Sequence, residues 1–231
     1  MHVCPPMLGL PVFWSRFVDF GQIVQSITVY ALPLLFAITL HEAAHGYAAQ
    51  KFGDQTAFIL GRISINPVKH IDPVGTIVVP LAMALLNTGF IFGWAKPVPV
   101  NFNNLRNPKK DMIWVAAAGP GANLVMAVLW AIMARVALEL GGFGSFWWLM
   151  AIAGIQVNVI LMVFNLFPLL PLDGGRVLSG LLPPKLAWEY NKIEPYGMFI
   201  LIGLIVTGLL TPIIFPIIQM VVQWLVTLFI L

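Results

Sequence analysis

Charged residues are scarce in this sequence. Lys, Arg, Asp and Glu make up 9% of its 231 residues, while 60% of the residues are hydrophobic. A typical soluble domain carries about 25% charged residues, and a soluble domain of this size could not cover its surface with so few. The composition argues against a soluble enzyme, a disordered regulator and a nucleic-acid-binding protein. It indicates an integral membrane protein with several spans.

Cysteine and histidine are also rare. The single cysteine, Cys4, excludes an intrachain disulfide and any metal site that needs two thiolates. Any metal centre must therefore use histidine and carboxylate ligands. Four histidines are available: His2, His41, His45 and His70.

Long apolar runs fill most of the chain. They cover about 22–51, 73–92, 112–136, 146–170, 195–211 and 213–231. A helix needs about 20 residues to cross the hydrocarbon core, so the sequence predicts an all-α multi-pass membrane protein with about five or six transmembrane helices. The run 73–92 starts at a proline and contains another, and we expect it to be re-entrant or interfacial.

Two loops have a strand-like pattern. Residues 61–66 alternate apolar and polar side chains, and residues 96–101 contain Pro97 and Pro99, which favour extended backbone in the residues before them. Both segments could offer a strand edge to an extended peptide, or could simply cap the helix bundle.

The first long apolar run contains the sequence His41-Glu42-Ala43-Ala44-His45. Residues four apart lie on one face of a helix, so His41 and His45 can bind one metal ion, with Glu42 close enough to take a proton from its water. A carboxylate within a membrane helix costs about 2.5–3.5 kcal/mol on insertion scales. Its presence there favours a functional role over a solvated helix end.

A catalytic zinc site usually has three protein ligands. His2 lies at the terminus, and His70 lies in a loop beside charged residues, where we expect it to be solvated. Asp173 directly follows a long apolar run, in a turn rich in proline and glycine. The sequence therefore predicts Asp173 as the third ligand.

Three segments together resemble the site-2 protease family of intramembrane zinc metalloproteases. They are the His-Glu-x-x-His motif, Ala118-Gly119-Pro120-Gly121-Ala122-Asn123, and the run from Asn165 to Gly175 with Pro168 and Leu172-Asp173-Gly174. No intervening stretch is long enough for a PDZ or CBS domain, so the resemblance is to a compact member. It implies one domain over 1–231, with a catalytic core at about 22–180 and C-terminal helices at 195–231.

The resemblance also implies residue roles and a reaction. One zinc ion per chain would be bound by His41, His45 and Asp173, with Glu42 as the catalytic acid and base. Asn123 and Asn165 match asparagines that hold the substrate backbone or the oxyanion, although each could instead join helices. The expected substrate is a transmembrane helix of another protein within the lipid membrane, and the oligomeric state is open. A metal-ion transporter and a catalytically silent binding relative are the alternatives.

The basic residues predict an orientation. If 73–92 does not span the membrane, ten of the twelve Lys and Arg residues lie on one side, which the positive-inside rule identifies as the cytoplasm. The three motifs then converge on that side. The sequence thus predicts a cell-membrane protein whose active site opens nearer the cytoplasmic face.

Overall fold

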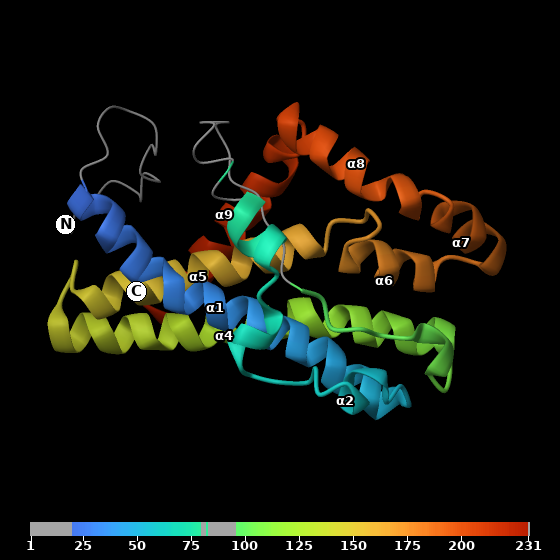
Figure 1. Ribbon diagram of the computed structural model, residues 1–231. Coiled ribbons are helices and arrows are strands. Elements are labelled where there is room, and N and C mark those ends of the chain that lie inside the picture. Colours follow the sequence, from blue (N-terminus) through green and yellow to red (C-terminus); the bar gives the residue numbers. More distant parts are fainter. Residues whose placement is uncertain (1–19, 80–81, 83–95, 231) are drawn as a thin grey trace.

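The computed structural model describes residues 20–79, 82 and 96–230. In this part of the chain the structure is helical and contains no strand (Figure 1). The α-helices are α1 (Phe20–Phe52), α2 (Thr56–Ile59), α4 (Pro108–Gly141), α5 (Phe146–Asn165), α6 (Asp173–Leu181), α7 (Pro184–Asn191), α8 (Glu194–Val206) and α9 (Thr211–Phe229). Short turns of 3₁₀- or π-helix cover Pro67–His70, Pro73–Val78 and Phe102–Asn104.

Four of these helices, α1, α4, α5 and α9, are long and apolar enough to cross a membrane. The apolar helix α8 has only 13 residues, about 20 Å at 1.5 Å per residue, and a turn with Gly208 at φ +72° separates it from α9. The protein is therefore an all-α multi-pass membrane protein, as predicted. The last two apolar runs form two separate helices, α8 and α9.

Helix α4 is central to the bundle, because it packs against α1, α5 and α6. Figure 1 shows α1 and α5 running in the same direction and α4 running in the opposite one. Parallel α1 and α5 are the arrangement expected if 73–92 does not cross the bilayer. Only 73–79 and 82 of that segment are described, as a π-helical turn at Pro73–Val78, so the rest of the prediction lies outside the described residues.

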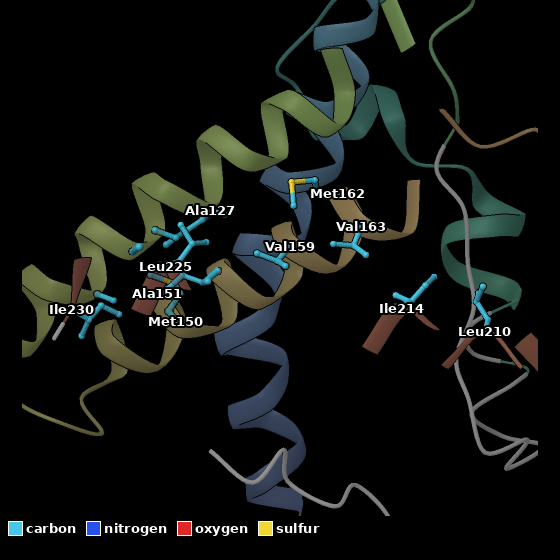
Figure 2. Close-up of a cluster of buried hydrophobic side chains, with 14 of the residues drawn as sticks. Ala127, Met150, Ala151, Val159, Met162, Val163, Leu210, Ile214, Leu225 and Ile230 are labelled. Carbon is cyan, nitrogen blue, oxygen red and sulfur yellow. The ribbon is translucent and has the colours of Figure 1, made fainter. Parts of the chain in front are cut away.

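Small side chains allow α4 and α5 to approach closely. Ala127, Ala131 and Ala134 of α4 and Ala151 of α5 are completely buried in the main hydrophobic cluster (Figure 2). Membrane helices associate through such close contacts because lipid supplies no hydrophobic driving force. Gly154 of α5 is the tightest point, since a Cβ atom there would lie 2.3 Å from Cδ2 of Trp130.

The segments 61–66 and 96–101 are not strands in the structure. The Arg62 side chain links them instead, because its guanidinium donates to the carbonyls of Lys96 and Pro97. The Lys96 N–H donates to the carbonyl of His70, which lies outside both segments. The prolines explain this arrangement, because Pro97 and Pro99 have no N–H with which to form a ladder.

We predict that Gly154→Ala destabilises the bundle by about 1–3 kcal/mol, because the added methyl group collides with Trp130. Gly203→Ala in α8 is the matched control, since a Cβ at Gly203 has no neighbour within 4 Å. That change should be neutral or should stabilise the helix by about 0.5–1 kcal/mol. Thermal unfolding in detergent measures both, and equal stability of the two variants would contradict the close contact.

Candidate metal centre

His41 and His45 lie one turn apart on α1 and point to the same place. Their Nε2 atoms are 3.1 Å apart, and both side chains are buried. The helical spacing of four residues produces this pairing directly.

The other ring nitrogen of each histidine is bound by α4. Nδ1 of His41 lies 2.6 Å from Oδ1 of Asn123, and Nδ1 of His45 lies 2.8 Å from the carbonyl oxygen of Val115. Both partners are acceptors, so each Nδ1 carries the proton of the neutral ring. Each Nε2 is then left with a free lone pair, which is the form that binds metals.

Asp173 supplies a third acceptor from a distant part of the chain. Pro168 and Pro171 interrupt the helix after Asn165, so Asp173 is the first residue of the separate helix α6 and not the end of α5. Its Oδ2 lies 3.2 Å from Nε2 of His41 and 3.3 Å from Nε2 of His45.

Two glycines allow the chain to fold back at this point. A Cβ atom at Gly174 would lie 2.1 Å from the carbonyl oxygen of Leu166, and one at Gly175 would lie 2.4 Å from the backbone nitrogen of Leu170. No other residue type fits these positions without moving the backbone. The paired glycines therefore let the start of α6 pack closely against the backbone of residues 166–170.

The three atoms fit a bound cation. Oδ2 of Asp173 is buried and has no hydrogen-bond partner among the described residues. Two lone pairs and a carboxylate that face one another need a positive ion between them. Ligands of a tetrahedral zinc ion lie roughly 3.3 Å apart, close to the distances above, and these three residues form a group that could hold a metal ion.

Glu42 is held beside this group by the 96–101 segment. Its Oε2 accepts a 2.7 Å hydrogen bond from the N–H of Val98. Arg62 binds the carbonyls of the two residues that precede Val98. Nη2 of its guanidinium lies 3.0 Å from the oxygen of Lys96 and 3.3 Å from that of Pro97. The position of the Glu42 carboxylate therefore depends on a segment more than fifty residues away in the chain.

Asp54 anchors the other end of the same segment. It is completely buried, and its Oδ2 accepts a hydrogen bond of 2.7 Å from the N–H of Asn101. Its Oδ1 accepts hydrogen bonds from the N–H of Thr56 and from Nδ2 of Asn104. Burial acts to raise the pKa of this carboxyl, but these hydrogen bonds outweigh burial and lower it. An ionised Asp54 thus ties α1 to residues 101–104.

Asn123 and Asn165, the two asparagines predicted to lie near the active site, have different surroundings in the structure. Asn123 is completely buried at the metal centre, and its Nδ2 donates to the carbonyl of Ala37 and to Oδ1 of Asn158. Its polar atoms are therefore used within the protein. In the described structure, the hydrogen bond of the Asn165 side chain goes from Nδ2 to the carbonyl of Leu161 in its own helix, not to the metal centre.

The expectation for His70 was wrong. Its side chain is 2% exposed, and its Nε2 lies 2.8 Å from the carbonyl oxygen of Ser64. The 3₁₀ turn at Pro67–His70 directs the ring under the 61–66 loop instead of into solvent. Sequence reasoning also missed Asn158 and Arg62. The position of Asn158, a polar residue within an apolar run, could have indicated its role, whereas nothing in the sequence indicated the role of Arg62.

Gly119 of α4 gives a direct test of the site. A Cβ atom there would lie 2.3 Å from Nε2 of His45 and 2.7 Å from Cε1 of His41, whereas one at Gly121 meets nothing within 4 Å. We predict that Gly119→Ala displaces the imidazoles and abolishes binding of a divalent metal, while Gly121→Ala retains it. Metal analysis of the purified variants measures this difference, and full metal content in Gly119→Ala would contradict the geometry.

The chain is similar to several curated proteins. It is 36% identical over 197 residues to the provisionally named zinc metalloprotease YwhC of Bacillus subtilis, covering 80% of this chain and 83% of that protein. It is 32% identical to the provisionally named zinc metalloprotease Rip2 of Mycolicibacterium smegmatis, over 75% of this chain and 64% of Rip2. It is 24% identical to the zinc metalloprotease MJ0392 of Methanocaldococcus jannaschii, over 68% of this chain and 35% of that protein.

No family model matches the chain, and no solved structure matches it significantly. The similarity to YwhC nevertheless covers most of both proteins. Taken with the three acceptors that meet at the start of α6, it shows that this chain belongs to the site-2 protease-like family of zinc metalloproteases.

Proposed function

We propose that this protein is an intramembrane zinc endopeptidase of the site-2 protease type, which cleaves a peptide bond within or near a transmembrane helix of another protein. The observation that carries the proposal is the convergence of Nε2 of His41, Nε2 of His45 and Oδ2 of Asp173 within 3.1–3.3 Å. These residues would hold one zinc ion per chain. The names of the relatives support a zinc metalloprotease.

The residues around the centre suit peptide hydrolysis. Zinc, when bound, acts as a Lewis acid and lowers the pKa of a coordinated water towards about 7. Glu42 accepts one proton of the attacking water while the water oxygen forms a bond to the peptide carbonyl carbon. Glu42 then returns the proton to the amide nitrogen as the carbon–nitrogen bond breaks. The products are one new carboxyl terminus and one new amino terminus.

The substrate must present an extended peptide, because a helix hides its carbonyls in i to i−4 hydrogen bonds. Segment 96–101 lies beside Glu42 through the Val98 N–H. Most of its N–H groups are absent or already bonded, so we propose that its carbonyl oxygens that Arg62 does not bind accept hydrogen bonds from an extended substrate chain. We propose Asn165 for binding of the substrate carbonyl. Nδ2 of Asn123 already donates two hydrogen bonds, to Ala37 and to Asn158, whereas Nδ2 of Asn165 donates one in the described structure, to Leu161, and its second N–H is left for the substrate.

We place the protein in the cell membrane with this site towards the cytoplasm. The four apolar helices support a multi-pass arrangement. The excess of Lys and Arg on the side of the three motifs supports the orientation.

Glu42→Gln should separate chemistry from metal binding. The amide keeps the size of the side chain but cannot take a proton, so we expect unchanged zinc content and a loss of cleavage of about 10²–10⁴-fold. Glu139→Gln is the matched control, since Glu139 pairs with Arg135 on α4 and is exposed. The assay follows a reporter anchored by a single transmembrane helix, together with zinc analysis.

Each result of this experiment is informative. Undiminished cleavage by Glu42→Gln would remove Glu42 from the mechanism. Wild-type protein that binds zinc and cleaves no membrane-anchored reporter would favour a silent relative, and zinc flux into vesicles would favour a transporter.

Arg62→Gln should reduce turnover without removing zinc. The shorter amide cannot reach the carbonyls of Lys96 and Pro97, so the segment that holds Glu42 shifts, and displacement of a catalytic group costs about 10–100-fold in rate. Lys69→Gln is the control, because Nζ of Lys69 also binds a carbonyl in this loop, that of Gly61, but does not touch residues 96–97. Equal turnover by the two variants would show that Arg62 does not position Glu42.

A further inference from the structure

A chain of amide hydrogen bonds leads from α5 to His41. Asn158 and Asn123 are both completely buried. Nδ2 of Asn158 lies 2.8 Å from the carbonyl oxygen of Gly154, its Oδ1 accepts a 3.0 Å bond from Nδ2 of Asn123, and Oδ1 of Asn123 lies 2.6 Å from Nδ1 of His41. The chain thus joins three helices in the apolar interior.

The bond from Asn158 to the Gly154 carbonyl determines which atom donates and which accepts in every hydrogen bond of this chain. A backbone carbonyl can only accept, so the NH₂ group of Asn158 must face Gly154 and its oxygen must face Asn123. Asn123 must then turn its NH₂ group towards Asn158 and its oxygen towards His41. The Ala37 carbonyl, 3.2 Å from Nδ2 of Asn123, requires the same orientation.

This direction selects the tautomer of His41. An acceptor at Nδ1 keeps the proton on Nδ1, and the lone pair stays on Nε2, which faces His45 and Asp173. If the Asn123 amide were reversed, its NH₂ group would face Nδ1, and the proton would occupy Nε2, where the metal must bind. The partners of a metal-bound histidine set its affinity in this way.

We propose that Asn158 is a positioning residue for the metal centre, which acts through Asn123 to hold His41 in the tautomer that binds zinc. The inference rests on the proposed function, because it concerns the same metal. Asn158 contacts neither the metal ligands nor Glu42 by any hydrogen bond in the described structure. Its effect must therefore pass through the Asn123 amide.

Loss of Asn158 has a defined consequence. Without its oxygen, one N–H of the buried Asn123 has no acceptor, and an unsatisfied buried donor is unfavourable. Asn123 can relieve this only by moving, which loosens the hydrogen bond to Nδ1 of His41. The remaining bond to Ala37 is longer, at 3.2 Å, and cannot by itself hold both ends of the amide.

Gln156 provides a matched control on the same helix. Its Oε1 accepts a 3.0 Å hydrogen bond from the hydroxyl of Tyr30, so it also links α5 to α1. That bond does not connect to His41. Gln156→Leu therefore removes one interhelical hydrogen bond and leaves the metal ligands untouched, and such bonds contribute about 0.6 kcal/mol on average in membranes.

The experiment measures zinc affinity by competition with a chelator in purified full-length protein. Asn158→Leu should bind zinc about 10–100-fold more weakly than wild type, while Gln156→Leu should bind it as wild type does. Asn158→Asp should restore affinity, because a neutral carboxylic acid in this buried site offers an O–H to Gly154 and an oxygen to Asn123. Equal zinc affinity of Asn158→Leu and Gln156→Leu would overturn the inference.

A spectroscopic measurement adds a readout on the wild-type protein, which does not depend on the folding of any variant. With only four histidines, selective ¹⁵N-histidine labelling gives a simple spectrum of the zinc-loaded wild type. We expect a proton on Nδ1 of His41, shifted in Asn158→Leu and unchanged in Gln156→Leu. A zinc-bound Nδ1 in the wild type would overturn the inference. A wild type that binds no zinc would instead overturn the proposed function.

Discussion

The structure depends on one electrostatic constraint, which is that two imidazole nitrogens and a carboxylate oxygen, all capable of binding a cation, meet in a buried site. Nε2 of His41, Nε2 of His45 and Oδ2 of Asp173 would repel one another in the absence of a positive ion. Every neighbouring contact keeps them in that state, because Asn123 and Val115 hold the ring protons on the far side of each imidazole. The fold therefore stabilises an arrangement that becomes favourable only with a cation.

Helix α4 imposes most of this arrangement. It provides the acceptors Asn123 and Val115, and it provides Gly119, whose missing side chain leaves room for both imidazoles. The same helix packs against α6, which begins with Asp173. A single helix thus sets both the ring orientation and the space for the ligands. This accounts for Gly119 and Asn123 within an otherwise apolar span, where each would otherwise weaken the helix.

The sequence predicted those parts of the site that follow from local periodicity. The spacing of His41 and His45 places them on one helical face, and the apolar runs correspond closely to α1, α4, α5, α8 and α9. The approach of Asp173 depends on tertiary folding, and it was predicted from its position in a proline- and glycine-rich turn after an apolar run and from the resemblance of that segment to the site-2 protease family.

Other parts of the site could not be derived from the sequence, because they depend on backbone carbonyls. Val115 acts through its peptide oxygen, and Arg62 binds peptide oxygens of Lys96 and Pro97, so the residue types carry no signal. The burial of His70 has the same origin, since Ser64 contacts it through a carbonyl. Asn158 did carry a signal, because a polar amide in the middle of a membrane span is costly, but its link to His41 requires the positions of three helices.

Under the proposed function, in which Glu42 is the catalytic acid and base, its placement depends on such non-local contacts. α1 fixes the backbone of Glu42 beside His41, but a glutamate side chain has several rotamers, and helix geometry alone does not choose among them. The Val98 N–H chooses one by binding Oε2, which leaves Oε1 to accept a proton. Because Val98 belongs to a segment without strand pairing, its own position must be fixed at both ends, by Arg62 before it and by Asp54 after it. A carboxylate that is held through an irregular segment can be placed accurately only if that segment is anchored in this way. If Glu42 acts as the proposed base, Arg62 and Asp54 therefore position it, although neither forms a hydrogen bond to the candidate metal ligands in the described structure.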